Sequence, residues 1–500
     1  MSTSPSGRIQ RGRACLPCHL RKKKCDGGQP TCGSCVRSRT CCEYEPLLPA
    51  RTSTPTGQSR IQALQSRVEE LEVVLNTMST QPSPSSTHAL PPTSALIDTR
   101  TGEVVSWLQD ILRPTLIANR RHYNLYLDTA TLRSPPQPLL HAMNLVACHL
   151  LSLSANSNTH PTLQELDELK SILLKRVHNG IHMSLEGARD LIAGVVCAPA
   201  LAAQYLLQVG KFAEAHWLAS SAIRFAVSCG LHTVAGHRWV NEGNGGSPGS
   251  TSSSQSGGTF LVPAASAREY YDRCMSWWLA FAADGMVEIV AKLPSALRPE
   301  LRACIGDMEY GIGGTRSITT SFPLMENVYE RNSRQLETSG LAMKGLFLGN
   351  HGSVQDPSMS SIFAIRLKSM AFFEIAALLY NDSRTSQSLG PDVFQRIDQG
   401  ITRFIETLPG LAYYEPTHAG VPPASDAPVN PNMIVAYMLA YTAKINLLSA
   451  NATAYSAQHR LDAALAVGRL ATTLNVTPDI SLVPLITESE DFPLFCVQQR

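Results

Sequence analysis

The chain has 500 residues, of which 44% are hydrophobic, so it is long enough to form a sizeable core and more than one domain. Its 42 basic and 40 acidic side chains nearly cancel, which excludes a protein that is strongly basic or acidic along its whole length. The charge is unevenly distributed: residues 1–45 hold nine basic and three acidic side chains, which leaves 33 and 37 for the rest. A basic segment ahead of a slightly acidic body is typical of a segment that meets a polyanion.

Cysteines are concentrated between residues 15 and 42, in the sequence CLPCHLRKKKCDGGQPTCGSCVRSRTCC. Six of them form two identical C-x2-C-x6-C units, Cys15, Cys18 and Cys25 followed by Cys32, Cys35 and Cys42. A C-x2-C pair offers two sulfurs to one tetrahedral ion and is the commonest zinc signature in proteins.

Three thiolates per unit cannot fill four positions on each of two zinc ions. The shortfall closes if the first cysteine of each unit, Cys15 and Cys32, bridges both metals. The expected ligand shells are Cys15, Cys18, Cys25 and Cys32 for one ion, and Cys32, Cys35, Cys42 and Cys15 for the other.

This stretch resembles the fungal binuclear zinc-cluster transcription factors, whose pattern has the same paired units and a basic run before the third cysteine. Lys24-Cys25-Asp26, Pro30 and Cys42-Glu43-Tyr44 agree with that pattern. The family spacing favours Cys42 over Cys41 as the sixth ligand and leaves Cys41 as a spare thiol. The resemblance implies two Zn2+ per chain, a small two-helix cluster, double-stranded DNA as the partner and the nucleus as the location.

Other interpretations of the cysteine stretch are a disulfide knot and a zinc-stabilised interaction scaffold without sequence-specific DNA binding. Met1–Gln10 has no apolar segment, so we expect neither a secretory signal nor an oxidising compartment, which argues against disulfides. The basic charge argues against the scaffold, which stays open as the alternative function. The chain has no P-loop or H-E-x-x-H motif, and its G-x-S-x-G match, at residues 245–249, lies in a Gly/Ser-rich insert, so we expect no enzyme.

The basic run HLRKKK lies between the second and third cysteines. In a short helix pinned by metal, these side chains fan out from one end and reach phosphates and base edges of a major groove. The resemblance implies that Lys22 reads the guanines of a CGG triplet, with Arg21 and Lys24 on the DNA backbone and Lys23 as a further contact. His19 stands where the family often has arginine, which puts one phosphate contact of the family in doubt.

Residues 46–60 are rich in Pro, Thr and Ser, which predicts a linker. The next stretch, IQALQSRVEELEVVLNTM, repeats apolar residues at steps of three and four, the a and d positions of a coiled coil. We expect two such helices to join two chains in a homodimer, because an isolated helix of this length is marginal in water. An amphipathic helix docked on the body is the other interpretation. The predicted seam consists of Ile61, Leu64, Val68, Leu71, Leu75 and Met78.

From about Glu103 onward, apolar residues recur at helical spacing, clearly so over 162–179, 211–231 and 268–292. This spacing predicts a large all-α domain. Leu191–Val209 has no charged side chain, but Pro199 and two glutamines lie inside it and no basic cluster flanks it. We therefore expect two buried core helices meeting near Pro199, and no membrane partner.

The segments Gly210–His232 and Arg268–Leu297 resemble the middle homology region that follows the DNA-binding head in the same family. The resemblance implies a regulatory body that acts through the transcription machinery or co-regulators, and control of a metabolic pathway. We favour a secondary-metabolite gene cluster over nutrient use, although no residue decides this. Six further cysteines have no paired spacing and are expected to be reduced core residues: 148, 197, 229, 274, 304 and 496.

The predicted fold is thus a small zinc-stapled two-helix cluster plus a short coiled coil, followed by a large all-α domain. The expected domains are a disordered basic arm (1–14), the binuclear zinc-cluster DNA-binding domain (15–45), a linker (46–60), the coiled-coil dimerisation helix (61–78), a disordered linker (79–102) and the all-α regulatory domain (103–500) with a flexible insert (241–260).

Overall fold

The structure is a computed structural model, and it divides into two compact units, Met1–Ala89 and Leu90–Arg500. The predicted coiled coil at 61–78, the linker at 46–60 and the insert at 241–260 lie outside the residues that it describes. The described residues are 15, 18, 22, 24–26, 31–38 and 42 in the first unit, and 96–98, 100–154, 161–187, 190–233, 261, 264–310, 317–324, 342–347, 356–384, 391–413, 429–450 and 454–474 in the second.

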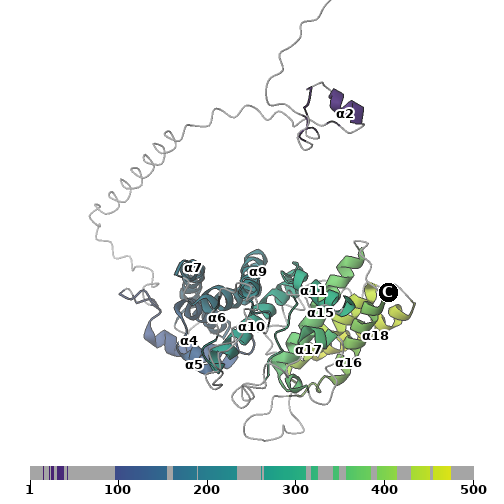
Figure 1. The fold of residues 1–500 in the computed structure, drawn as a ribbon. Helices are drawn as coiled ribbons and strands as arrows, with labels where there is room; N and C mark the ends of the chain where they lie inside the picture. The colour runs from purple at the N-terminus through teal and green to yellow at the C-terminus, as the bar shows by residue number, and fades with distance from the viewer. Residues whose placement is uncertain are drawn as a thin grey trace, which may run out of the picture. The chain divides into compact units, whose positions relative to one another are not determined.

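The second unit is helical, as the apolar spacing predicts (Figure 1). Its described residues form no β-strand: an isolated antiparallel bridge joins Ile97 and Val104, and Ala264 lies in a further bridge. The described helices are α2 (Gly33–Ser38) in the first unit and, in the second, α4 (Ser106–Asn119), α5 (Thr129–Arg133), α6 (Gln137–Ser154), α7 (Leu163–Gly187), the π-helix η2 (Ile192–Cys197), α8 (Ala198–Gln208), α9 (Phe212–Ser228), α10 (Ala267–Ala291), α11 (Arg298–Tyr310), α14 (Met343–Phe347), the 3-10 helix η5 (Pro357–Ser360), α15 (Ile362–Arg384), α16 (Pro391–Thr407), α17 (Pro431–Ser449) and α18 (Ala454–Leu474).

The helices expected at 162–179, 211–231 and 268–292 are confirmed as α7, α9 and α10. The start of α10 follows from its local sequence. Ser266 stands immediately before the helix, and its hydroxyl accepts the amide hydrogen of Glu269 at 3.2 Å. The Glu269 carboxylate in turn accepts a backbone amide hydrogen from the residue before Ser266, so the two side chains form a reciprocal cap.

Two glycines end the neighbouring helices α8 and α9. Gly210 and Gly230 have φ angles of 75° and 78°, in the left-handed region that other residues disfavour. After α9, the amide of Leu231 donates back to the carbonyl of Ala226 at 3.0 Å, which is the Schellman arrangement, and the equivalent bond closes α8. The sharp turn at Gly210 allows α9 to fold back and pack beside α8.

The charge-free stretch Leu191–Val209 is buried in the second unit over residues 194–207, whereas its two ends are partly exposed. It forms the π-helix η2, which continues directly into α8, and Pro199 lies in the first turn of α8. The amide of Ala198 still donates to the carbonyl of Ala193, so Pro199 lies inside a continuous helical run and removes one hydrogen bond where the π-helix gives way to α8. The first of the two expected core helices is thus a π-helical segment.

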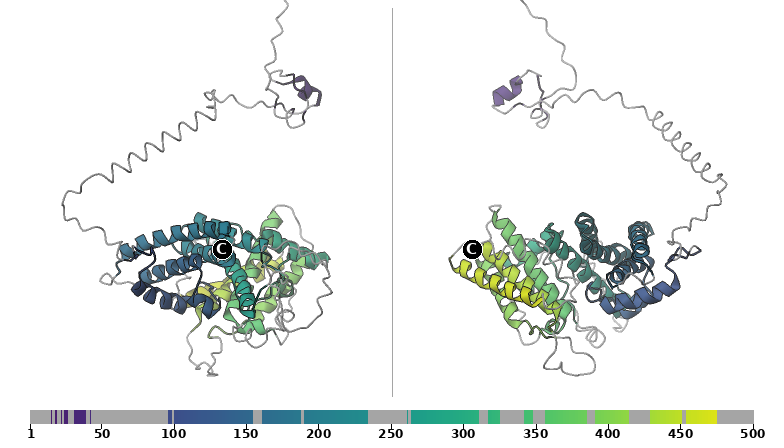
Figure 2. Two further views of the ribbon diagram at one scale, coloured as in Figure 1. Left: turned by 60° about the vertical axis from the view of Figure 1, so that its left-hand side comes forward. Right: turned by 180° about the vertical axis from the view of Figure 1, so that it is seen from behind.

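The helix α10 is central to the second unit. It packs against η2, α8 and α9 and also against α15, and the helices that precede and follow it gather on its two sides (Figures 1 and 2). Trp277, Trp278 and Phe281 are completely buried, and the ring of Trp278 stacks on Phe322 with centroids 4.7 Å apart. Among the described residues α10 alone has the length and composition to cross a membrane, yet 94% of its apolar window is buried inside the protein.

The core of the second unit begins before residue 103, the expected start of the all-α domain. Leu96 is 1% exposed and belongs to the main hydrophobic core together with Val104. The amide of Val105 donates to the carbonyl of Leu96 at 3.1 Å. The last part of the stretch 79–102, expected to be a disordered linker, therefore packs with the body.

The cysteines of the second unit are core residues. Cys148, Cys197, Cys229, Cys274 and Cys304 are reduced and buried, which confirms the expectation for these five, whereas position 496 lies outside the described residues. Burial raises the pKa of Cys197 and Cys274 to about 12, so neither offers a reactive thiolate at neutral pH.

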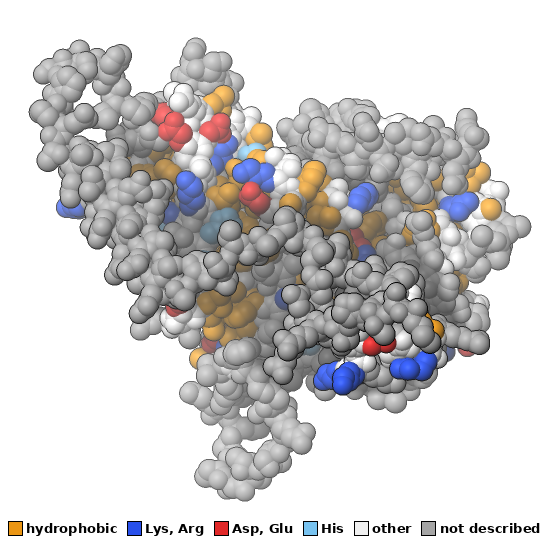
Figure 3. Space-filling view, turned by 90° about the horizontal axis from the view of Figure 1, so that it is seen from above, with side chains coloured by type: hydrophobic (Ala, Val, Ile, Leu, Met, Phe, Trp, Pro, Cys, Tyr) orange, Lys and Arg blue, Asp and Glu red, His pale blue; other side chains and the backbone are white. Residues whose placement is uncertain are grey.

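On the face drawn in Figure 3, the described acidic and basic side chains are interspersed, unlike the basic excess of residues 1–45.

Three carboxyl groups come together between α10 and α15. Asp284 and Glu374 are 0% and 1% exposed, and Glu288 is 8% exposed. The hydroxyl of Ser295 lies 2.7 Å from a carboxyl oxygen of Asp284 and 3.4 Å from one of Glu374. A hydroxyl can donate only one hydrogen, so the second contact is favourable when Glu374 carries its own proton. The Arg298 guanidinium lies 3.4 Å from Glu288 and partly offsets the negative charge.

Burial raises the pKa of Glu374 well above its ordinary value of 4.5 and raises that of Glu288 to about 7. The folded chain therefore binds protons that the unfolded chain has released. The stability that such a proton contributes is fully present below the pKa of the group in the unfolded chain. It is lost as the pH rises through the pKa of the group in the folded chain. For these groups the loss begins near pH 4.5 and, at Glu288, extends to about pH 7.

Replacing Glu374 by Gln is expected to stabilise the protein at pH 8. The amide keeps the shape of the neutral carboxyl and cannot ionise, so the melting temperature should rise by about 2–4 °C at pH 8, with less change at pH 5. Thermal unfolding of the full chain at both pH values measures this. Glu186→Gln, the same change at an exposed position, is the control and should leave both values unaltered. A lower melting temperature for Glu374→Gln at pH 8 would contradict the neutral state of this group.

Candidate metal centre

Each C-x2-C pair of the first unit is shaped by a tight backbone turn. The amide of Cys18 donates to the carbonyl of Cys15 at 3.1 Å. In the second pair, the amide of Val36 donates to the carbonyl of Cys32 at 3.0 Å, and α2 begins directly after Cys32. Such turns place both sulfurs of a pair on the same side of the backbone.

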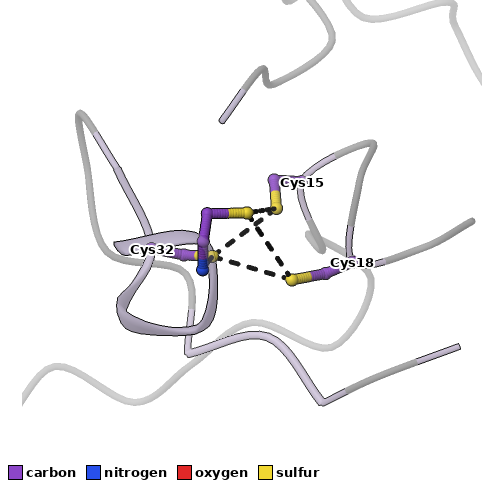
Figure 4. Close-up of side chains that lie close together, drawn as sticks. Cys15, Cys18 and Cys32 are labelled. Carbon is purple, nitrogen blue, oxygen red and sulfur yellow. Dashed lines mark hydrogen bonds between the residues drawn. The ribbon is translucent and has the colours of Figure 1, made fainter. Parts of the chain in front are cut away.

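The sulfurs of Cys15, Cys18, Cys32 and Cys35 lie within 4.8 Å of one another, and all four side chains are buried. Figure 4 shows Cys15, Cys18 and Cys32 pointing toward a common point. The distances are 3.6 Å for Cys15–Cys32, 3.7 Å for Cys15–Cys35 and for Cys18–Cys32, and 4.0 Å for Cys18–Cys35. Zinc–sulfur bonds of about 2.3 Å in a tetrahedron place two sulfurs about 3.8 Å apart. The spacing of the sulfurs therefore fits zinc.

The remaining two cysteines complete this arrangement. The sulfur of Cys25 lies 3.9 Å from that of Cys15. The thiol of Cys42 interacts with those of Cys15, Cys32 and Cys35, the three partners that its expected shell requires. Among the four distances given above, the longest separates Cys18 and Cys35, which share no zinc in the predicted shells. The six sulfurs thus form one cluster, and the division of its ligands between two ions with Cys15 and Cys32 as bridges stays a prediction.

The electrostatics of the thiols also favour a cation. The backbone amide of Cys35 donates to the sulfur of Cys32 and that of Cys32 to the sulfur of Cys42, and these bonds lower the pKa of Cys32 and of Cys42. Burial has the opposite effect and raises the pKa of Cys15, and that of Cys35 to about 12. Thiols this close cannot all ionise alone, because their negative charges repel. A divalent cation removes that cost and binds the thiolates.

Two of the five predicted DNA-binding residues are described, and both are exposed. Lys22 lies in a turn with a φ of 50°, in the left-handed region, and Lys24 lies outside regular secondary structure. The structure thus presents both amines to solvent beside the metal centre. His19, Arg21 and Lys23 lie outside the described residues, as do all six residues of the predicted dimer seam.

Sequence reasoning missed a contact between the two cysteine units. The amide of Gly33, the first residue of α2, donates to both carboxylate oxygens of Asp26, at 3.0 and 2.9 Å. Aspartate is a common helix cap, but a cap normally stands immediately before its helix. Asp26 lies seven residues before Gly33, so local sequence gave no signal for this contact.

Comparison with known proteins gives a family match at the metal centre. Residues 13–51 match the model of the fungal Zn(2)-Cys(6) binuclear cluster domain. A domain of this family binds two zinc ions, and the cysteine geometry agrees. The family match covers the metal centre, so the resemblance of the body to a middle homology region stays a prediction.

Three curated relatives match a short stretch of this chain. It is 38% identical over 89 residues to the C6 finger domain transcription factor hasF of Aspergillus fumigatus, covering 15% of this chain and 12% of the relative. It is 41% identical over 70 residues to the citrinin biosynthesis transcriptional activators mrl3 of Monascus ruber and ctnR of Monascus purpureus, covering 14% of this chain and 13% and 11% of the relatives. The alignments therefore span about an eighth of each relative. No solved structure matches the chain.

The bridging assignment predicts that cysteine substitutions differ in their effect on zinc content. Cys15→Ala removes a ligand from both ions, so the zinc content should fall from two per chain toward zero. Cys18→Ala removes a ligand from one ion, and about one zinc per chain should remain. Metal analysis of the purified full chain after dialysis against a weak chelator measures the content.

Cys41→Ala is the matched control, because Cys41 is the neighbouring thiol that the predicted shells leave out. This variant should keep both zinc ions. Retention of two zinc ions by Cys15→Ala with unchanged affinity would contradict the bridging assignment, and loss of zinc from Cys41→Ala would exchange the roles of Cys41 and Cys42.

Proposed function

Because residues 13–51 are a fungal Zn(2)-Cys(6) binuclear cluster domain, we propose that this chain is a sequence-specific DNA-binding transcription factor that acts on RNA polymerase II genes. The observation that carries the proposal is the pairing of a zinc-fitting thiol cluster with exposed lysines beside it. The three relatives, all transcription regulators by name, support the same class. We propose no enzymatic step.

The proposed recognition follows from the position of the basic run. Lys22 lies at the exposed turn after Cys18, where its amine can donate to the O6 and N7 acceptors of guanine in a major groove. We assign Lys22 to the guanines of a CGG-like triplet. Arg21, Lys23 and Lys24 are assigned to phosphates of the DNA backbone. His19 is assigned to the margin of the same DNA-binding surface. Affinity that depends on phosphate neutralisation falls steeply as salt rises.

One zinc head reads few base pairs, so specificity gains from pairing two heads. The heptad pattern of residues 61–78 supports a parallel coiled coil between two chains, and therefore a homodimer that binds two triplets. The two heads then bind one DNA molecule together, which raises the affinity of the pair above that of either head.

The biological setting is proposed from the relatives. Two of them are named as activators of citrinin biosynthesis, a secondary-metabolite pathway. We propose that this chain acts in the nucleus on genes of a metabolic pathway, a secondary-metabolite gene cluster in preference to nutrient use. The helical body is proposed to set activity through the transcription machinery or co-regulators.

Lys22→Gly tests the proposed base contact. Glycine adopts a φ of 50° without strain, so this variant removes the amine and leaves the turn intact. Selection of binding sites from random duplexes with the zinc-loaded full chain should enrich paired CGG-like triplets. The variant should lose that preference, with an affinity for the selected site reduced by about 10–100-fold.

Lys24→Ala is the control for a lost positive charge. It should weaken binding to all sequences alike and reduce the salt dependence by about one phosphate contact. If the wild-type chain enriches no sequence at low salt, the proposal is overturned in favour of the zinc-stabilised interaction scaffold.

The double substitution Leu64→Asp and Leu71→Asp tests the homodimer. Two charges in the predicted seam should make the chain monomeric, because a buried unpaired carboxylate costs several kcal/mol. Sedimentation of the full chain measures the mass. Gln62→Asp with Ser66→Asp places the same charges on the outer face of the heptads and should leave the dimer intact. A dimer that survives the seam substitutions would contradict the coiled-coil assignment.

A further inference from the structure

The contact between Asp26 and Gly33 joins the two cysteine units by a hydrogen bond from backbone to side chain, and a carboxylate oxygen of Asp26 also lies within 4.8 Å of the sulfurs of Cys25 and Cys32. Asp26 directly follows Cys25, the last cysteine of the first C-x2-C-x6-C unit. Gly33 directly follows Cys32, the first cysteine of the second C-x2-C-x6-C unit. The amide of Gly33 lies 3.0 and 2.9 Å from the two carboxylate oxygens of Asp26. A hydrogen bond to an ionised carboxylate is stronger than one between neutral groups. The bond thus closes the chain segment that connects the two units.

The absence of a side chain at residue 33 is part of this contact. A Cβ atom added to Gly33 would lie 2.4 Å from Oδ2 of Asp26, far inside van der Waals contact, with its next described neighbour at 3.6 Å on the same side chain. Within the described residues, a larger residue at position 33 would therefore displace the Asp26 carboxylate and little else. Its φ angle is not positive, so the backbone itself does not require glycine here. The two residues fit one another as a pair.

Zinc coordination alone leaves the backbones of the two cysteine units free to tilt relative to one another, and the hydrogen bond between Asp26 and Gly33 removes this freedom. Bridging thiolates fix where the sulfurs lie, but each side chain can rotate about its own bonds, so the backbone of one unit can still tilt relative to the other. The Asp26 carboxylate binds the backbone of α2 directly. The lysine run ends at Lys24, two residues before Asp26, so the direction of the chain that carries the exposed lysines is fixed against α2.

We propose that Asp26 is a positioning residue for DNA recognition, which holds the Lys22–Lys24 segment against the second cysteine unit through Gly33. This proposal rests on the proposed DNA-binding function. Asp26 itself carries a negative charge and is not expected to touch DNA. Its effect is to hold the lysine amines in the one orientation that matches a base triplet.

The direction of the change in DNA affinity distinguishes a positioning role of Asp26 from an effect of its negative charge alone. Removing a carboxylate beside a basic segment should strengthen binding to DNA if charge alone mattered, since the attraction to phosphate rises. We expect the opposite for Asp26→Ala: affinity for the selected site should fall about tenfold, at the low end of what a hydrogen bond to a charged group contributes. Affinity for unrelated DNA should not fall.

The experiment compares zinc-loaded full-length variants for binding to the duplex that the wild-type chain selects. The variants are Asp26→Ala, Asp26→Asn, Gly33→Ala and the double variant Asp26→Ala with Gly33→Ala. The control is Glu43→Ala, which removes an acidic side chain elsewhere in the same head. Zinc content and the rate of zinc transfer to a chelator are measured for every variant.

All variants should retain two zinc ions. Gly33→Ala should lose about as much affinity as Asp26→Ala, because both break the same contact, and the double variant should be no worse than either. Asp26→Asn keeps an oxygen that accepts the Gly33 amide and should lose only about threefold. Glu43→Ala should bind as tightly as the wild type or more tightly.

Two results would overturn the proposal: wild-type affinity in Asp26→Ala, or losses from the two single substitutions that multiply in the double variant. If the wild-type chain selects no sequence at all, the proposed function fails instead. The coupling of Asp26 and Gly33 is then judged from the chelator rates, which both single substitutions should increase by the same factor and the double variant should not increase further.

Discussion

The close approach of buried thiols is the constraint on which the first unit depends. Its hydrophobic cluster consists of Cys15, Cys18, Cys32 and Cys35, with Cys25 and Cys42 packed against it. Sulfurs 3.6–4.0 Å apart gain little from hydrophobic burial, and their charges repel once they ionise. The metal turns this repulsion into attraction. Folding of this unit and binding of zinc are therefore one event, as expected for a segment too small to bury an apolar core.

The same constraint shapes the surface that we propose contacts DNA. The ligands fix where the chain must turn, and the exposed Lys22 occupies a left-handed turn between the second and third cysteines. A residue other than glycine in this conformation costs about 1 kcal/mol, which the surrounding metal ligation offsets. The Asp26–Gly33 bond adds an electrostatic contact between the two units that the sulfurs do not supply. Metal, turn and hydrogen bond together determine how the amines are displayed.

The second unit is held by different physics. Its core is apolar and continuous, and α10 carries two completely buried tryptophans through the middle of it. A core this large also encloses charged groups, and each needs a partner. Lys368, 0% exposed, lies 2.6 Å from Asp356, whereas the Glu374 carboxyl meets other acids and lowers the cost by keeping its proton. Zinc should thus govern the stability of the first unit, and pH that of the second.

The sequence by itself determined the zinc cluster and the helical class of the body. Counting the ligands from Cys15 to Cys42 is enough to predict the cluster, because tetrahedral coordination demands a fixed number of sulfurs at short spacing. Helices such as α7 and α10 can be predicted because the spacing of their apolar residues is a local property of the sequence. Tertiary structure alone decided the contacts between distant positions. Leu96 joins the core although its neighbourhood is predicted to be a linker, Ser295 meets Glu374 across 79 residues, and Asp26 accepts the amide of Gly33, seven residues later. Such pairings depend on how finished elements pack, and no local pattern encodes them.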